Sequence, residues 1–327
     1  MKRRSVLKLT LAAGLGTMAS GSQAKSGGQD WPTRPVKVIV PFTPGGSTDI
    51  AARIVAAHMS QAFGQTFIVE NRPGGGGNIG LAAVQRADAD GYTVGLITTA
   101  HAINATLFKT PGYDLKKGLR QIGIIYSGPL VLAANPDAPF DSVKSLIAYA
   151  RKNPGKVNFA STGIGGSTHL AGELFDLKAG IRMTHVPYKG SAPAIADVIG
   201  GTCQIMFDTT ISSLPHIQAG KLRPLGVTSP RRADQLPQVP TIAEAGLPGY
   251  EVAAWNGLCA PAGTPDAVIE KLNASLVEAI SQPDIKERMY KLGSSVQPLT
   301  AAQFGKFVQA EADKWAEVLV AAKIERV

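Results

Sequence analysis

Residues 36–63 read VKVIVPFTPGGSTDIAARIVAAHMSQAF, so that a short apolar run, a glycine-rich turn and a longer periodic segment follow one another. The run Val36–Val40 predicts a buried strand, and Pro41–Gly46 predicts a loop. From Thr48 to Phe63 the apolar residues recur every three or four positions, which predicts a helix with one buried face. This stretch therefore predicts one strand–loop–helix unit of an α/β fold.

The same unit recurs along the chain. The sequence predicts further strands at 67–69, 92–98, 130–134, 157–160, 183–186, 205–207, 225–227 and 251–258, and further helices at 81–87, 142–151, 168–178, 192–199, 265–281 and 301–322. Asp141 is the expected N-cap of the helix at 142–151. Alternating strands and helices are typical of a mostly parallel, doubly wound sheet.

A chain of 327 residues is long enough for two domains. The long helical stretch at its C-terminus predicts a return to the first domain, with chain crossings near Tyr126–Leu130 and Val227–Trp255. We therefore expect a first lobe made of residues 31–128 and 254–327 and a second lobe made of residues 129–253.

The N-terminus is typical of an export signal. Four basic residues, Lys2, Arg3, Arg4 and Lys8, precede an apolar run at 9–19 that is too short to span a bilayer. The small residues Ser22 and Ala24 predict cleavage after Ala24, so that residues 1–24 form a signal peptide. The paired arginines are compatible with a twin-arginine signal or with an ordinary Sec signal, and either route predicts a periplasmic protein.

Removal of the signal leaves 29 basic and 24 acidic residues, a net charge of +5. This modest excess favours small anionic ligands. It does not favour nucleic acid, because no dense basic stripe interleaves with aromatic residues. Cys203 and Cys259 lie in separate apolar runs; export permits a disulfide between them, while two buried free thiols are the alternative. No cysteine or histidine spacing of a metal site is present, and no cofactor is expected.

The tetrapeptide Gly-Gly-Ser-Thr occurs twice, at 45–48 and again at 165–168. Each copy follows a predicted strand and opens a predicted helix. Glycine allows a ligand to approach the backbone, and the unpaired N–H groups of a helix N-terminus favour an anion. The pair predicts two loops that close on a carboxylate from opposite lobes. Two tight turns with ordinary helix caps remain the alternative.

Four further features are candidates for a site. The glycine-rich run Pro73–Asn78 lacks the ending of a nucleotide P-loop, and either borders the cleft or forms a plain turn. His101 follows the strand predicted at 92–98, and His169 lies in the first turn of the helix predicted at 168–178; for each, a structural role is the alternative to ligand contact. Asp208 ends a strand, where it either contacts a polar group of a ligand or caps the loop. Ser167 and His169 are two residues apart on a helix, where such side chains diverge, so they do not form a hydrolytic pair.

Several motifs together resemble the Bug family, the extracytoplasmic receptors of tripartite tricarboxylate transporters. They are PFTPGGSTD at 41–49, ENRPG at 70–74, DGYT at 90–93, STG at 161–163, HLAGE at 169–173, VPYKG at 186–190, LPGY at 247–250 and APAGTP at 260–265. The resemblance covers nearly all of the chain after the signal. It implies a type II periplasmic-binding-protein fold, with two α/β lobes and a ligand cleft between them.

The resemblance also implies the function. The expected protein captures a di- or tricarboxylate, an aromatic acid or an amino acid, hands it to membrane transporter subunits, and acts as a monomer without enzymatic activity. A ligand sensor for a membrane signalling partner, or a secreted hydrolase or isomerase, is the alternative. The expected ligand-binding residues are Phe42, Thr43, Gly45, Gly46, Ser47, Asp49, His101, Thr162, Gly163, Gly166, Ser167, Thr168, His169 and Asp208.

Overall fold

The computed structural model describes residues 31–321 and 324–327, so the expected signal peptide at 1–24 lies outside the described residues. The strands are β1 (Val36–Val40), β2 (Phe67–Asn71), β3 (Thr93–Thr98), β4 (Leu119–Ala134), β5 (Asn158–Ser161), β6 (Thr184–Pro187), β7 (Ile205–Thr209), β8 (Arg223–Val227) and β9 (Ala253–Pro261). The helices are α1 (Ser47–Phe63), η1 (Gly75–Gly77), α2 (Asn78–Gln85), α3 (Thr99–Leu107), α4 (Val143–Lys152), α5 (Ser167–Ala179), α6 (Ser191–Ile199), α7 (Thr210–Gln218), α8 (Asp266–Ser281), α9 (Pro283–Lys291) and α10 (Ala301–Ala321).

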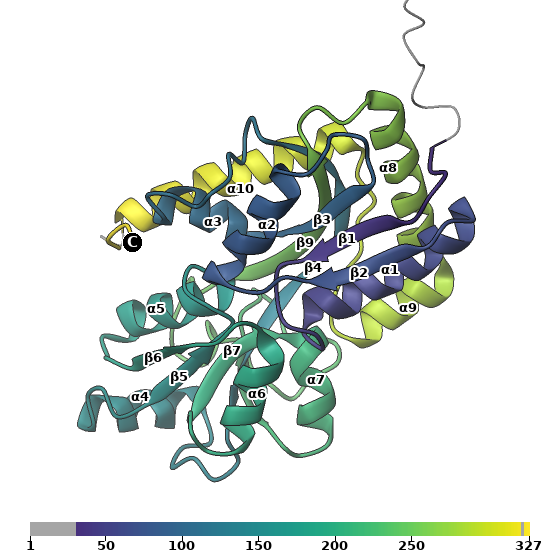
Figure 1. Cartoon of the computed structure of the whole chain (residues 1–327). Coiled ribbons are helices and arrows are strands. Elements are labelled where there is room, and N and C mark those ends of the chain that lie inside the picture. The colour runs from purple at the N-terminus through teal and green to yellow at the C-terminus, as the bar shows by residue number, and fades with distance from the viewer. Residues whose placement is uncertain (1–30, 322–323) are drawn as a thin grey trace, which may run out of the picture.

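Strands and helices alternate as the hydrophobic pattern predicts. In the first lobe β1 pairs in parallel with β2 and β3, and β3 pairs antiparallel with β9. In the second lobe β5 pairs in parallel with β6 and β7. The two groups of strands are visible in the upper and lower halves of Figure 1, with helices on both sides of each. Of the pairings between the described strands, four are parallel and four, all of which involve β4 or β9, are antiparallel, so the sheet is mixed and not mostly parallel as expected. The loops after the parallel strands gather where the two lobes face each other.

Strand β4 joins the two lobes. Its first part pairs with β9 as far as Pro129, and from Leu130 onward it pairs with β7 and β8 instead. The hydroxyl of Thr228 lies beside this change of partner, where it accepts from the N–H of Leu130 at 2.8 Å and donates to the carbonyl of Val252 at 2.5 Å. We propose on this basis that the lobes divide at 128/129 and 253/254.

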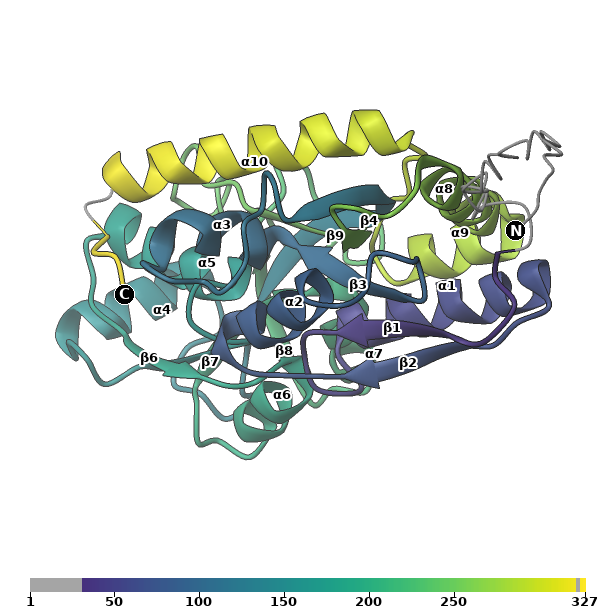
Figure 2. The same cartoon turned by 45° about the horizontal axis from the view of Figure 1, so that its top comes forward.

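The C-terminal helices return to the first lobe. Helix α8 packs against α1 and β4, and α10 packs against α3 and β4. Figure 2 shows α10 running along the molecule above α3 and β9, so that its C-terminal end approaches α5 of the second lobe. No helix in residues 31–321 and 324–327 combines the length and the hydropathy needed to cross a membrane.

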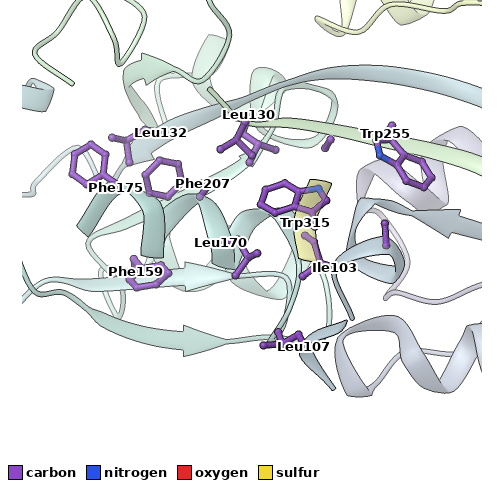
Figure 3. Close-up of a cluster of buried hydrophobic side chains, with 14 of the residues drawn as sticks. Ile103, Leu107, Leu130, Leu132, Phe159, Leu170, Phe175, Phe207, Trp255 and Trp315 are labelled. Atoms are coloured by element: carbon purple, nitrogen blue, oxygen red, sulfur yellow. The ribbon is translucent and has the colours of Figure 1, made fainter. Parts of the chain in front are cut away.

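One large buried cluster reaches from one lobe into the other. It includes Ile103 and Leu107 of α3, Trp315 of α10, and Leu170 and Phe175 of α5. Figure 3 shows Leu170 beside Ile103 and Trp315, while Phe175 packs further out against the second-lobe sheet. Burial of apolar surface therefore stabilises the contact between the lobes as well as each lobe alone.

The structure corrects the start of α4. Ser142, and not Asp141, is the N-cap, because its hydroxyl accepts from the N–H of Ser145 at 3.2 Å. Asp141 instead accepts a hydrogen bond from the Ser145 hydroxyl at 3.0 Å. Cys203 and Cys259 are both buried free thiols, as the second of the two alternatives held.

Candidate ligand-binding site

A small cavity of about 40 Å³ lies where the two lobes meet, and leaves room for only a few water-sized groups. The lining residues are Phe42, Gly46, Ser47, Thr48, Thr98, Thr99, Ala100, Tyr126, Thr162, Gly166, Ser167, Thr168, Ser191, Asp208, Thr209, Ala254, Trp255 and Asn256.

Five helices begin at this cavity, namely α1, α3, α5, α6 and α7. In four of them the N-cap side chain accepts no hydrogen bond from a first-turn N–H group; these N-caps are Gly46, Gly166, Gly190 and Thr209. The Thr209 hydroxyl lies 2.9 Å from the hydroxyl of Ser212 instead. Only α3 is capped from within, by Thr98 and His101. The first-turn N–H groups of the other four helices are therefore available to an anion, which their helix dipoles also stabilise.

The repeated tetrapeptides supply two of these helix starts from opposite lobes. Gly45 and Gly165 have φ values of 82° and 77°, which glycine adopts without strain. Gly46 and Gly166 have ordinary extended backbones, with φ values of −82° and −74°. A side chain at Gly46 would meet the Cβ of Ser191 at 3.5 Å across the cleft. The first glycine of each pair therefore shapes the turn, and the second keeps the cavity open.

Hydroxyl and amide groups form the rest of the wall. The side-chain N–H₂ of Asn256 donates to the hydroxyls of Thr48 at 3.2 Å and Tyr126 at 2.6 Å. In the second lobe, the hydroxyls of Thr162 and Thr168 lie 2.9 Å apart. These contacts fix the orientations of groups that would otherwise rotate, so less order has to be imposed when a polar ligand binds.

Asp208 is the one formally charged residue among those that line the cavity. It is fully buried and accepts hydrogen bonds from the hydroxyls of Ser191 at 2.8 Å, Ser212 at 2.5 Å and Ser213 at 3.1 Å. Burial raises the pKa of Asp208, and these hydroxyls oppose the rise. No lysine, arginine or histidine lines the cavity, so an anion there would be held by N–H and O–H donors alone.

Eight of the fourteen expected site residues line the cavity. They are Phe42, Gly46, Ser47, Thr162, Gly166, Ser167, Thr168 and Asp208. Gly163 lines a neighbouring cavity of about 240 Å³, which shares Phe42 and Thr162 with the first. Thr43, Gly45, Asp49, His101 and His169 line neither of the two.

Three of these five residues, Gly45, Asp49 and His101, make hydrogen bonds within the first lobe. Asp49 accepts from the N–H of Gly45 at 3.0 Å and from Arg53 at 2.9 Å, and so fixes the turn before α1. Burial works to raise the pKa of Asp49, but these hydrogen bonds and one from Asn71 lower it. His101 is fully buried, and its ring nitrogens lie 3.0 Å from the Thr98 nitrogen and 3.2 Å from a backbone oxygen of the glycine turn.

The other two residues act on the second lobe. The Nδ1 atom of His169 accepts from the N–H of Gly165 at 3.2 Å, and its ring stacks on His185 with centroids 4.0 Å apart. The N–H of Thr43 donates to the carbonyl of Lys189 at 3.2 Å, which joins the loop after β1 to the loop before α6. Both residues hold loops beside the cavity, and neither lines it.

The expected set leaves out several lining residues. Ser191 and Thr209 carry a local signal, since each stands where a strand-to-loop segment leads into a helix. Tyr126, Trp255 and Asn256 carry no such signal, because they lie within β4 and β9 and reach the cavity through the crossing of those strands. Among the described residues, no cluster of histidine, cysteine and carboxylate side chains has the arrangement of a metal site.

The comparison with protein families assigns the chain. Residues 51–324 match the tripartite tricarboxylate transporter family receptor, and the chain belongs to this family. It is similar to the protein BugT of Bordetella pertussis, with 35% identity over 317 residues that cover 96% of this chain and 97% of BugT. The resemblance to the Bug family is thereby confirmed.

Solved structures agree with this assignment. The periplasmic binding protein BugD matches with a TM-score of 0.87 and 37% identity, over 90% of this chain and 99% of BugD. Rpa4515 of Rhodopseudomonas palustris, solved with adipate, matches with a TM-score of 0.88 and 37% identity, over 91% and 100%. MatC of the same species, solved with malate, matches with a TM-score of 0.85 and 31% identity, over 88% and 100%. The type II periplasmic-binding-protein fold is confirmed, and the chain is a solute-binding receptor of this family.

Proposed function

We propose that the mature protein captures a small carboxylate in the periplasm and delivers it to the membrane subunits of a tripartite tricarboxylate transporter. The carboxylate would lie between the N-termini of α1 and α5, with Gly46, Ser47, Gly166 and Ser167 around it. The expected residues that do not line the cavity would act indirectly, by holding these two loops.

One observation carries this proposal. Four helices begin at the cavity without a side-chain cap, and no cationic side chain lines it. Four hydrogen bonds to a carboxylate, at about 1.5–3 kcal/mol each, amount to roughly 6–12 kcal/mol before losses. Micromolar affinity requires about 8 kcal/mol net, so closure of the lobes has to cost little.

The relatives support a carboxylate as the ligand class. Adipate and malate, the acids present in the structures of Rpa4515 and MatC, each carry two carboxylates. The cavity of the present chain offers backbone N–H and hydroxyl donors to a first carboxylate. We infer that the ligand is a small organic acid, and we assign no single acid on these grounds.

The binding test compares acids with their neutral amides. Titration calorimetry with adipate, malate, benzoate and glutamate should detect binding of at least one acid, while the matched amide of that acid should not bind. An amide that binds as tightly as its acid would contradict an anion site. A protein that binds none of the four acids would contradict the proposed ligand class.

We propose further that binding leaves the ligand chemically unchanged. The Ser161 hydroxyl lies 2.6 Å from Nε2 of His185, but Ser161 is fully buried and neither residue lines the cavity, while Asp208 in the cavity is held by three serine hydroxyls. The bound acid should be recovered intact after long incubation with the protein. Conversion that disappears on replacement of Asp208 would assign an enzyme instead. A role as a ligand sensor shares this chemistry and differs only in the membrane partner.

A further inference from the structure

The glycine turn at 74–77 packs directly on the ligand loop of the other lobe. A side chain on Gly76 would overlap the carbonyl oxygen of Ile164, and a Cβ atom on Gly163 would lie 3.2 Å from the Cα atom of Gly76. The backbones of the two lobes therefore touch at Gly76 with no side chain between them. Such an approach is possible only for glycine.

Asn104 of α3 contacts both segments, the turn at Gly76 and the loop at Gly165. It is fully buried, and its side-chain N–H₂ donates to the carbonyl of Gly76 at 3.2 Å and to Asn78 at 2.9 Å. Its side-chain oxygen is buried without a hydrogen-bond partner among the described residues and faces the backbone of Gly165, since a Cβ atom there would overlap it. Asn104 thus holds the turn of the first lobe against the loop of the second.

The loop that receives this contact also supplies the carboxylate site. Ile164 lies between Gly163 and Gly165, and the N–H of Gly166 donates to the carbonyl of Gly163 at 3.2 Å. Gly166 and Ser167 then open α5 at the cavity. A shift of the Gly76–Ile164 contact would therefore displace both the second lobe and the ligand donors.

We propose that Gly76 and Asn104 are positioning residues that close the two lobes over the ligand, by a latch between the turn at 74–77 and the loop at 163–165. The latch rests on the proposed binding function for its purpose, but its geometry is independent of which acid binds. Neither residue belongs to the lining of the carboxylate cavity. Their replacement should therefore alter closure first, and affinity as a consequence.

Gly75 provides a matched control. Gly75 and Gly76 have nearly the same backbone, with φ values of 58° and 63°, so an alanine is comparably strained at either position. A Cβ atom on Gly75 would meet only Asn78 and Ile79 of its own lobe, at 3.6 and 3.7 Å. The Gly76→Ala and Gly75→Ala variants therefore differ mainly in contact with the second lobe.

The test measures the distance between the lobes and the affinity separately. Spin labels are placed on the exposed positions Gln61 and Lys152 through Gln61→Cys and Lys152→Cys, one in each lobe, while the native cysteines stay buried. Electron–electron resonance distances are recorded with and without adipate, and adipate affinity is measured by calorimetry. Gly76→Ala should lengthen the label separation and weaken adipate binding at least about tenfold, in proportion to the lost closed fraction. Gly75→Ala should leave the label separation unchanged and the adipate affinity within about twofold of the parent protein.

A second variant guards against a folding defect of the first. Asn104→Ala leaves every backbone in place and removes the side chain behind the latch, so it should also lengthen the label separation. Equal label distances in all variants and the parent would overturn the latch, even where adipate binds normally. If adipate fails to bind the parent, the choice of ligand fails, and the label distances without adipate still decide the latch.

Discussion

At the scale of single residues, the ligand loops depend on the absence of a side chain at Gly46 and Gly166. Both have backbone angles that other residues adopt easily. A Cβ atom on Gly46 would have only ordinary contacts, while one on Gly166 would lie 3.1 Å from the Thr162 hydroxyl and 3.3 Å from the Gly163 carbonyl oxygen. Larger side chains at either position would enter the space between the helix N-termini. Gly46 therefore separates binding from stability.

Gly46→Val should keep the fold and abolish binding of the acid, because the added methyl groups fill the cavity. Gly166→Val should also abolish binding, but at a cost in stability, because its Cβ atom is close to Thr162 and Gly163. Ser167→Ala should weaken binding by about 1–3 kcal/mol, since a carboxylate oxygen loses a donor. Thermal unfolding and calorimetry on the same samples separate the two effects. Wild-type affinity in both valine variants would place the site elsewhere.

Asp176 of α5 predicts a dependence of stability on pH. Burial raises its pKa from the usual 3.8 to about 6, against a hydrogen bond from the N–H of Met183 and with help from the charge of Glu173. The folded protein therefore holds this proton more tightly than the unfolded chain. Ionisation of Asp176 therefore lowers the stability of the folded protein. This loss of stability is absent below about pH 4, grows as the pH rises, and is complete above about pH 6.

Asp176→Asn removes this charge, so the change it makes in the free energy of unfolding should be about 1–2 kcal/mol more favourable at pH 7.5 than at pH 4. This figure allows for the partial solvent contact of the side chain. Urea unfolding at the two pH values measures this difference. An effect of the same size at both would show that the charge of Asp176 is not responsible.

At the scale of helices and strands, the sequence predicted those elements whose positions are set by residues close together in the chain. Strand β1 matches its predicted range, and α1 begins one residue earlier than predicted. The repeated tetrapeptides were visible because turn glycines and helix starts have characteristic residues. Helix α7 was not predicted, since Pro215 interrupts its pattern.

The first part of β4 was also not predicted, because Gly123, Gly128 and Pro129 are residues that strands disfavour. Its pairing with β9 overrides that preference. The same crossing of strands brings Tyr126, Trp255 and Asn256 to the cavity. Contacts between segments far apart in the chain have no local signature, which is why this wall of the site was missing from the expected residues.

The start of α4 gives a test of this local chemistry. Ser142→Ala should lower the free energy of unfolding by about 0.5–2 kcal/mol, because the N–H of Ser145 loses its cap. Asp141→Ala should cost less, since the side chain of Asp141 is exposed and accepts a hydrogen bond only from the hydroxyl of Ser145. Neither variant should change ligand affinity, because α4 does not reach the cavity. A larger loss from Asp141→Ala would restore Asp141 as the effective cap.

At the scale of the whole molecule, the lobes are joined in two ways that oppose each other. Strands β4 and β9 pair as far as Pro129 and Ala253 and carry the chain between the lobes, so we expect rotation of the lobes about these two residues. The apolar cluster of Ile103, Leu170 and Trp315 favours the closed arrangement. Ligand affinity then depends on the balance between this apolar contact and the cost of ordering both loops.

Delivery of an acid to a membrane transporter also requires the whole chain to reach the periplasm. The basic residues at 2–8, the apolar run at 9–19 and the small residues before Lys25 predict export with cleavage after Ala24. Cell fractionation should find the protein in the periplasm, and N-terminal sequencing should begin at Lys25. Full-length protein confined to the cytoplasm would contradict this. Replacement of Arg3 and Arg4 together by lysine preserves the positive charge of the segment but removes the paired arginines. Export of this variant should be blocked if the twin-arginine route is used. Unchanged export would assign the Sec route.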